Sequence, residues 1–253
     1  MTHRFSDRII KYSWLDTSLA DFYWQAQPAY VRESVVSWLE AWYRRLFLKE
    51  ARPPTILSLW GTNGVGKTTV AKGIAHFHIL NLACADTEFI PWGIFVDDQL
   101  NGQQIHPNWN AQMLIIDGLD KRRPVPESRS TWLLDKLSDR LEYRAEILHY
   151  PTITTSHRNP SEMAKFLTTS TTGQTDEHVL QSAHTLIEAF SSHLFATVEF
   201  KFSHELRAKC SSDQEFNKRL QHNARKQNMH EMGFHFLEKY NEETWWNDKE
   251  NLS

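Results

Sequence analysis

The sequence predicts an α/β fold in which helices cover both faces of a parallel sheet, giving three layers. Short apolar runs typical of buried strands occur five times, at residues 55–60, 89–96, 113–116, 150–156 and 195–202. Segments with apolar residues at helical spacing lie between them, most clearly at residues 69–80, 131–148 and 176–194. Strands that alternate with helices favour parallel pairing, because each crossover between parallel strands needs a long connection.

The chain divides into three parts around one main domain. At 253 residues and 40% hydrophobic content, it can bury one core and a small appendage. We expect a lead-in with an amphipathic helix at residues 1–50, the α/β core at 51–202 and a helical tail at 203–253. The apolar stripe of the lead-in helix is expected to pack on the sheet rather than bind a partner. Its members are Val31, Val35, Trp38, Leu39, Trp42, Leu46 and Phe47.

Composition restricts the class of protein. The formal net charge of −3 gives no general attraction to nucleic acid or to an anionic membrane, so any such binding must come from local patches. The two cysteines, Cys84 and Cys210, cannot form a disulfide framework and lack zinc spacing. With no long apolar segment and no signal-like N-terminus, we expect a cytoplasmic protein without a membrane segment.

A phosphate-binding motif follows the first predicted strand. "GTNGVGKT" at residues 61–68 matches G-x-x-x-x-G-K-[ST] and stands between a strand and a helix, as the motif requires. Its glycines allow backbone N–H groups to surround a phosphate at the helix N-terminus. We therefore expect ATP as cofactor, with Lys67 reaching the β- and γ-phosphates and the Thr68 hydroxyl on Mg²⁺. The predicted binding residues are Gly61, Thr62, Asn63, Gly64, Val65, Gly66, Lys67, Thr68 and Thr69.

A second metal-binding group is predicted at the end of another strand. Asp117 ends the apolar run at 113–116, and ligands of open α/β sheets gather at the carboxyl ends of strands. Its carboxylate is expected to hold Mg²⁺ with Thr68, directly or through water.

The chain also resembles the DnaC/IstB-like branch of the AAA+ ATPases, which comprises helicase loaders and transposition-helper ATPases. The resemblance covers roughly residues 20–202 and rests on the motif at 61–68, the lead-in helix and the segment "RLEYRAEILHYPTITTSHRNPSEM" at 140–163. That segment is similar to the family's sensor-1 strand, with Arg144, Pro151 to Ile153, and Thr155 to His157 before Pro160. Too few residues follow Phe202 for a C-terminal lid domain, which also fits this branch.

The resemblance implies an AAA+-type P-loop ATPase that assembles with a replicative helicase or a transposase, with DNA as co-ligand. It also implies a homo-oligomer that forms on ATP or DNA. Three catalytic positions of the family differ in this chain. Gly118 stands where an acid polarises the attacking water, His157 stands at the sensor-1 Asn, and Ser192-His193 replaces the Ser-Arg that supplies an arginine finger.

These departures predict a nucleotide-gated switch with slow or lost hydrolysis. Loss of an arginine finger alone can cost about 10³ to 10⁵ in rate, whereas the phosphate-binding groups remain. Other residues could replace the missing ones. Asp120 could position water, His157 could donate a hydrogen bond, and Arg158 or Arg144 could serve as the finger.

Basic residues indicate possible DNA contacts. Lys121, Arg122 and Arg123 follow Asp117 closely, and further basic residues occupy the tail, where a solvated helix face explains them equally well. The tail residues are Arg207, Lys209, Lys218, Arg219, Arg225 and Lys226. Trp245 and Trp246 could bind a partner or pack on the core.

Two other functions stay open. A small-molecule P-loop kinase would use the same nucleotide motif without a DNA or protein partner, although the strand at 150–156 is not needed for it. An adaptor of a virus or mobile element would bind ATP without hydrolysing it. The histidine spacings do not favour a metal site, and no G-x-S-x-G elbow indicates Ser/His/Asp catalysis.

Overall fold

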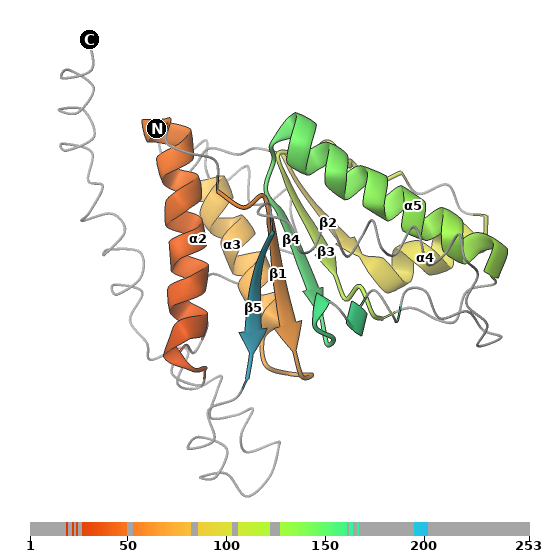
Figure 1. Cartoon of the computed structure of the whole chain (residues 1–253), viewed down its shortest axis with the longest axis horizontal. Coiled ribbons are helices and arrows are strands. Elements are labelled where there is room, and N and C mark those ends of the chain that lie inside the picture. Colours follow the sequence, from red (N-terminus) through yellow and green to blue (C-terminus); the bar gives the residue numbers. More distant parts are fainter. Residues whose placement is uncertain are drawn as a thin grey trace, which may run out of the picture.

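The computed structural model shows a parallel sheet between two layers of helices (Figure 1). It describes residues 19, 22, 24, 27–49, 53–81, 86–102, 106–121, 127–160, 162, 163, 166 and 195–201. The strands are β1 (Ile56–Gly61), β2 (Thr87–Pro91), β3 (Met113–Asp117), β4 (Thr152–Ser156) and β5 (Phe195–Phe200). Their order is β2-β3-β4-β1-β5, and every neighbouring pair is parallel. The predicted three-layer α/β fold is confirmed.

The helices connect these strands and cover the sheet. They are α2 (Ala29–Leu48), α3 (Lys67–Asn81), α4 (Trp92–Leu100) and α5 (Glu127–Tyr143), followed by a π-helical turn, η3 (Arg144–Leu148). Helices α2 and α3 lie on one side of the sheet, and α4 and α5 lie on the other (Figure 1).

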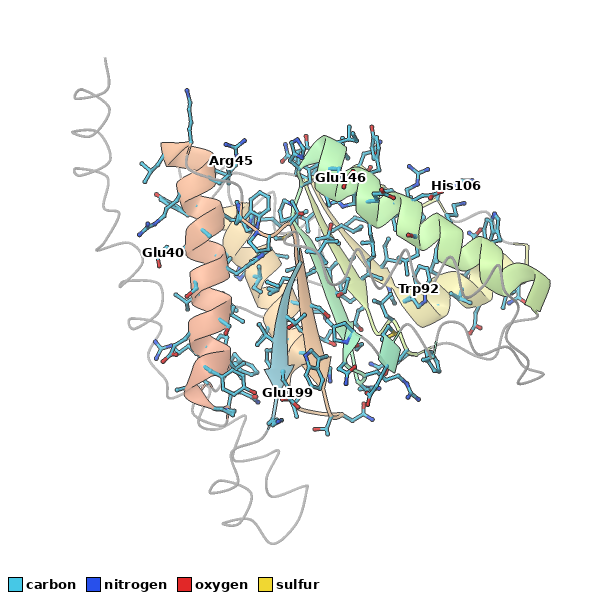
Figure 2. The ribbon with its side chains drawn as sticks, viewed as in Figure 1. Glu40, Arg45, Trp92, His106, Glu146 and Glu199 are labelled. Carbon is cyan, nitrogen blue, oxygen red and sulfur yellow. The ribbon has the colours of Figure 1, made fainter. Side chains whose placement is uncertain are left out.

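The sheet separates two hydrophobic cores, and β1, β2 and β3 contribute to both. In β3, Met113 and Ile115 belong to the core under α2 and α3, whereas Leu114 and Ile116 belong to the core under α4 and α5. Figure 2 shows side chains filling both spaces between the sheet and the helices. Successive side chains of a strand point to opposite faces, so a strand buried on both faces is apolar throughout. This explains the continuous apolar runs in the sequence.

The lead-in helix packs as predicted over most of its length. Val31, Val35, Trp38, Leu39 and Trp42 are all buried in the core that α2 shares with the sheet. Leu46 is different, because it lies in the last turn of the helix, which ends at Leu48, and is 48% exposed. The side chain of Phe47 lies outside the described part.

The prediction of one strand over residues 89–96 is wrong in its second half. Strand β2 ends at Pro91 and α4 begins at Trp92. Trp92, Phe95 and Val96 are buried at helical spacing, so one apolar run contains the end of a strand and the start of a helix. Periodicity cannot separate the two in so short a run.

The ends of the chain and several connections are outside the described part. The predicted helix at 176–194, the tail at 203–253 and its Trp245 and Trp246 fall there. Among the helices that the structure describes, none combines the length and apolar character needed to cross a membrane.

Candidate nucleotide-binding site

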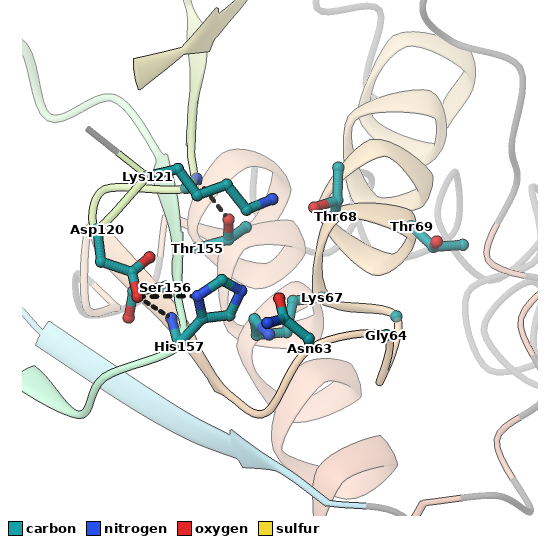
Figure 3. Close-up of a pocket in the computed structure, with 12 residues that line it drawn as sticks. Asn63, Gly64, Lys67, Thr68, Thr69, Asp120, Lys121, Thr155, Ser156 and His157 are labelled. Atoms are coloured by element: carbon teal, nitrogen blue, oxygen red, sulfur yellow. Dashed lines mark hydrogen bonds and ion pairs between the residues drawn. The ribbon is translucent and has the colours of Figure 1, made fainter. Parts of the chain in front are cut away.

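A polar pocket opens where β1, β3 and β4 end and α3 begins (Figure 3). Its volume is about 220 Å³. The carboxyl ends of parallel strands are the usual ligand position in open α/β sheets. The described lining residues are Asn63, Gly64, Gly66, Lys67, Thr68, Thr69, Gly118, Asp120, Lys121, Thr155, Ser156 and His157.

The glycine-rich loop is held in shape by the segment that precedes α2. Gly66 has φ +94°, and a Cβ atom there would collide with the ring of Phe22. One residue earlier, the carbonyl oxygen of Val65 accepts a hydrogen bond of 3.0 Å from Gln27 Nε2. The loop therefore needs glycine at position 66, both for its backbone angle and for its close approach to the lead-in.

Lys67 lies at the centre of the loop and is 7% exposed. Its Nζ donates to the carbonyl oxygens of Gly61 at 2.8 Å and Thr62 at 2.7 Å. The pKa of Lys67 is lowered to about 8, chiefly by burial and also by Lys121, while Asp120 and Asp117 oppose the shift. A buried ammonium beside a glycine loop at a helix N-terminus fits the phosphates of a nucleotide, whose charge would favour the protonated lysine.

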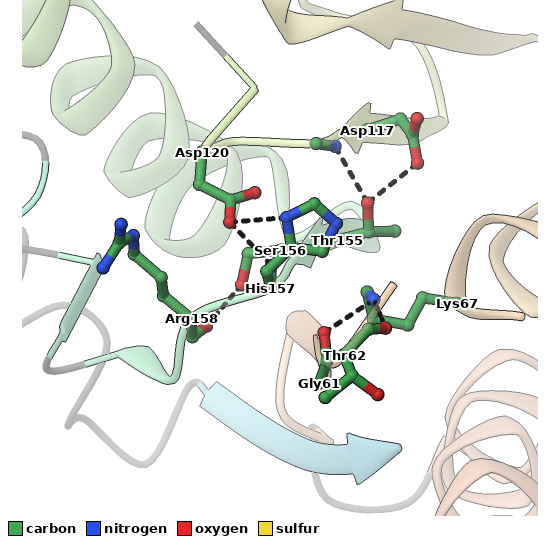
Figure 4. A network of polar contacts seen from close by, with 10 residues as sticks. Gly61, Thr62, Lys67, Asp117, Asp120, Thr155, Ser156, His157 and Arg158 are labelled. Carbon is green, nitrogen blue, oxygen red and sulfur yellow. Dashed lines mark hydrogen bonds and ion pairs between the residues drawn. The ribbon is translucent and has the colours of Figure 1, made fainter. Parts of the chain in front are cut away.

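The two predicted magnesium ligands lie together. The hydroxyl of Thr68 donates to Asp117 Oδ1 at 2.6 Å, and the hydroxyl of Thr155 donates to the same oxygen at 2.8 Å (Figure 4). Thr155 also accepts a 2.8 Å hydrogen bond from the backbone N–H of Gly118. Hydroxyl and carboxylate oxygens are ligands that Mg²⁺ prefers, so this pair fits the ion. Thr155 positions Asp117, a role that no sequence motif indicates.

Asp120 and His157 form a second polar pair beside the pocket. Asp120 Oδ2 accepts from the backbone N–H of His157 at 2.9 Å and lies 3.1 Å from its Nδ1. Burial lowers the pKa of His157, and Lys67 and Lys121 lower it as well, whereas Asp120 raises it. The predicted site residues Asp120 and His157 are therefore brought together, from the ends of β3 and β4.

Lys121 is a pocket residue that the sequence did not assign to the nucleotide. Figure 3 shows its side chain extending over the pocket toward Thr68. Gly118 has φ +69°, and a Cβ atom added there would lie 2.7 Å from Lys121 Cδ. A side chain at position 118 would thus compete with Lys121 for space. The sequence places Lys121 shortly after Asp117, in a run of basic residues. That run indicates a DNA contact rather than a nucleotide contact.

The two arginines considered as replacement fingers lie in different surroundings. Arg158 is exposed, its guanidinium carbon lies 4.7 Å from the ring centre of Phe166, and it is not a lining residue of the pocket. Arg144 is fully buried, so the prediction that it could act as a finger is wrong. It donates to the carbonyl oxygens of Trp109, Ala111 and Pro151 and to the Thr152 hydroxyl. Its guanidinium is committed to holding loops together.

The remaining predicted functional residues lie outside the described part. These are Arg122, Arg123, Ser192, His193 and the basic residues of the tail.

Solved structures with this architecture include DnaI, which has a TM-score of 0.55 and 21% identity over 74% of this chain and 92% of that chain. A protein from Streptococcus pyogenes serotype M3, described as a candidate primosome component, has a TM-score of 0.49 and 16% identity over 74% and 87% of the two chains. The DnaC helicase loader has a TM-score of 0.39 and 18% identity over 63% and 87%.

No family profile matches the chain, and no curated protein matches it by sequence. The similarity to DnaI therefore shows the fold alone. It agrees with the resemblance seen in the sequence to the DnaC/IstB-like AAA+ ATPases, and the chain adopts the three-layer P-loop fold.

Proposed function

We propose that this protein binds Mg·ATP and acts as a helicase-loader-like switch, assembling in its ATP-bound state with a partner in DNA replication or transposition. The observation that carries the proposal is that Lys67 and Thr68 line one pocket and that the Thr68 hydroxyl is bonded to Asp117. A buried ammonium and a pair of oxygen ligands are what a triphosphate with its Mg²⁺ requires. When bound, the metal ion would neutralise phosphate charge.

Slow hydrolysis is part of the proposal. Gly118 offers no carboxylate for the attacking water, and its left-handed φ of +69° disfavours any other side chain. Arg144, one of the two candidate replacement fingers, is buried and bonded. The binding groups are intact, so nucleotide affinity is expected to persist while turnover is low.

The choice of partner rests on the resemblance of the sequence, with a replicative helicase or a transposase as the protein and DNA as the co-ligand. The DNA contacts proposed are Arg122, Arg123 and the basic tail. Lys121 is assigned to the nucleotide pocket instead, because it is one of the lining residues. A homo-oligomer that forms on ATP or DNA is proposed with them.

The test is to measure ATP binding, ATP hydrolysis and molecular mass in solution for the full chain. Each is measured with Mg·ATP or Mg·ADP, with and without single-stranded DNA. Lys67→Ala should weaken ATP binding at least a hundredfold and remove any ATP-dependent increase in mass. Lys136→Ala, which changes a lysine of α5 outside the pocket, should leave nucleotide binding unchanged.

The outcomes separate the alternative functions. A larger mass with Mg·ATP than with Mg·ADP supports the switch. Transfer of phosphate to a nucleoside or nucleotide, with an unchanged mass, would instead identify a small-molecule kinase. ATP binding with assembly but no turnover would identify the non-hydrolysing adaptor.

A further inference from the structure

The pocket contains one carboxylate that could serve the attacking water. Among the described residues that line it, Asp120 is the only acidic one. It comes three residues after Asp117, on the turn that follows Gly118. What Asp120 can do depends on where its two oxygens point.

The Asp120 carboxylate is turned toward His157. Its side chain is 4% exposed, and Oδ2 is engaged by both the backbone N–H and Nδ1 of that residue. Oδ1 is buried and has no hydrogen-bond partner in the described part of the chain. With Oδ2 bonded to His157 and Oδ1 buried, the Asp120 carboxylate is placed to hold His157.

Both members of this pair line the pocket, and His157 is the more exposed one. Its side chain is 29% exposed, and Figure 3 shows the ring between Asp120 on one side and Lys67 on the other. A neutral ring that donates its Nδ1 proton to Asp120 keeps Nε2 as a proton acceptor. Burial, Lys67 and Lys121 all favour this neutral form by lowering the pKa of His157, while Asp120 opposes them.

We propose that His157 orients and deprotonates the water that attacks ATP, and that Asp120 is the positioning residue that fixes its ring and tautomer. This pair would take the place of the missing acid at position 118. The proposal rests on the proposed function, since it needs a nucleotide in the pocket.

The chemical step is balanced by groups already named. One O–H bond of water breaks and its proton goes to His157 Nε2, while the water oxygen forms a bond to the γ-phosphorus. The bond from the γ-phosphorus to the β,γ-bridging oxygen breaks, and its electron pair stays with ADP. The proton on Nε2 then leaves with phosphate or to solvent, which restores the neutral ring.

The first test needs no nucleotide. Nuclear magnetic resonance of the full chain with ¹⁵N-labelled histidine, assigned with His157→Ala, should show His157 as the Nδ1–H tautomer at pH 7. Its pKa should lie below the usual value of 6.5. In Asp120→Asn this pKa should fall further, because the carboxylate that favours the charged ring is removed. An Nε2–H tautomer in the wild type would overturn the proposal.

The second test is the pH dependence of ATP turnover at saturating Mg·ATP. His157→Ala should lower kcat by about 10²-fold or more, which is the usual contribution of a general base. Asp120→Asn should lower kcat and move the acidic limb of the profile to lower pH. A purely structural role for Asp120 would lower kcat without moving that limb. Matched controls outside the pocket are His106→Ala and Glu162→Gln, which should behave as wild type.

Binding measurements keep the two proposals distinct. His157→Ala and Asp120→Asn should bind ATP within about threefold of wild type, since they leave Lys67 and Thr68 in place. The His157 proposal fails if the wild type binds ATP and His157→Ala hydrolyses it at the wild-type rate. It also fails if the wild type binds ATP but its hydrolysis rate does not exceed that of Lys67→Ala. In both cases the nucleotide site stands. If wild type does not bind ATP at all, the proposed function fails.

Discussion

At the scale of single residues, Gly118 and Lys121 form one structural unit. The positive φ of Gly118 and the lysine stem packed beside it explain why a glycine stands directly after Asp117. They also bring a second ammonium to the pocket that already holds Lys67. The glycine at position 118 therefore affects both the shape and the charge of the site.

Replacing Lys121 should weaken nucleotide binding. We expect Lys121→Ala to lower the affinity for ATP by about tenfold, since a hydrogen bond to a charged group contributes about 1.5–3 kcal/mol. The affinity for ADP should change less, because ADP carries less charge. Isothermal titration calorimetry measures both, and Lys136→Ala is the control. Equal affinities for wild type and Lys121→Ala would mean that Lys121 does not contact the phosphates.

Replacing Gly118 should destabilise the fold in two ways. Gly118→Ala should lower the free energy of unfolding by about 1–2 kcal/mol for the left-handed backbone, with a further loss from the contact with Lys121. Gly102 is a matched control, because it has φ +75° but nothing within 4 Å of an added Cβ atom. Urea unfolding of both alanine variants should show the larger loss for Gly118→Ala. The same loss in both would exclude the steric contribution of Lys121.

The sequence indicated some of these residues better than others. Residues 61–68 match a motif of fixed spacing, and Asp117 ends an apolar strand, so the sequence alone predicts that Thr68 and Asp117 meet. The pairing of Asp120 with His157 joins residues 37 positions apart, and the position of Lys121 depends on a backbone angle at Gly118. Neither this pairing nor the position of the Lys121 side chain produces a motif or a periodic pattern in the sequence.

At the scale of helices and strands, buried polar side chains hold several elements in place. The guanidinium of Arg144 in η3 joins β4 to the loop that precedes β3. On the other side of the sheet, α3 carries His78, which is 1% exposed. Apolar runs predicted β1 and β3, and partial alternation predicted β5, whereas the boundary between β2 and α4 depends on packing within a single run.

Removing the Arg144 side chain should be strongly destabilising. Arg144→Met leaves the carbonyl oxygens of Trp109 and Ala111 without this donor, at about 1–3 kcal/mol for each buried group left unpaired, while the Pro151 carbonyl still accepts from the backbone. We expect a loss of at least about 3 kcal/mol in chemical denaturation. Arg158→Met removes an exposed arginine that follows the opposite end of β4 and should stay within about 0.5 kcal/mol. A comparably small effect for Arg144→Met would contradict the role assigned to its hydrogen bonds.

His78 should make the fold sensitive to acid. Burial lowers its pKa to about 3, whereas the unfolded chain has the ordinary value of 6.5. As the pH falls, the unfolded state therefore binds the proton first. The contribution of neutral His78 to the free energy of unfolding is complete above pH 6.5 and is lost as the pH falls toward 3. The expected slope for this group is about 1.4 kcal/mol per pH unit. In His78→Leu, the free energy of unfolding measured with urea should lose this part of its pH dependence between pH 6 and 5. The same slope in the variant and the wild type would mean that His78 does not titrate as inferred.

At the scale of the whole molecule, the lead-in and the phosphate loop are in direct contact. Phe22 packs on Gly66, Gln27 bonds to Val65, and α2 belongs to the same core as the sheet. A change of the loop on nucleotide binding would therefore reach α2 and the surface beside it. This physical connection is what a nucleotide-gated switch needs.

The central claim is that this pocket binds ATP through Lys67, and calorimetric titration of Mg·ATP into wild type and Lys67→Ala tests it most directly. We expect one site per chain in the wild type and at least a hundredfold weaker binding in Lys67→Ala. Binding of equal strength in the two proteins, or no binding in the wild type, would contradict the account.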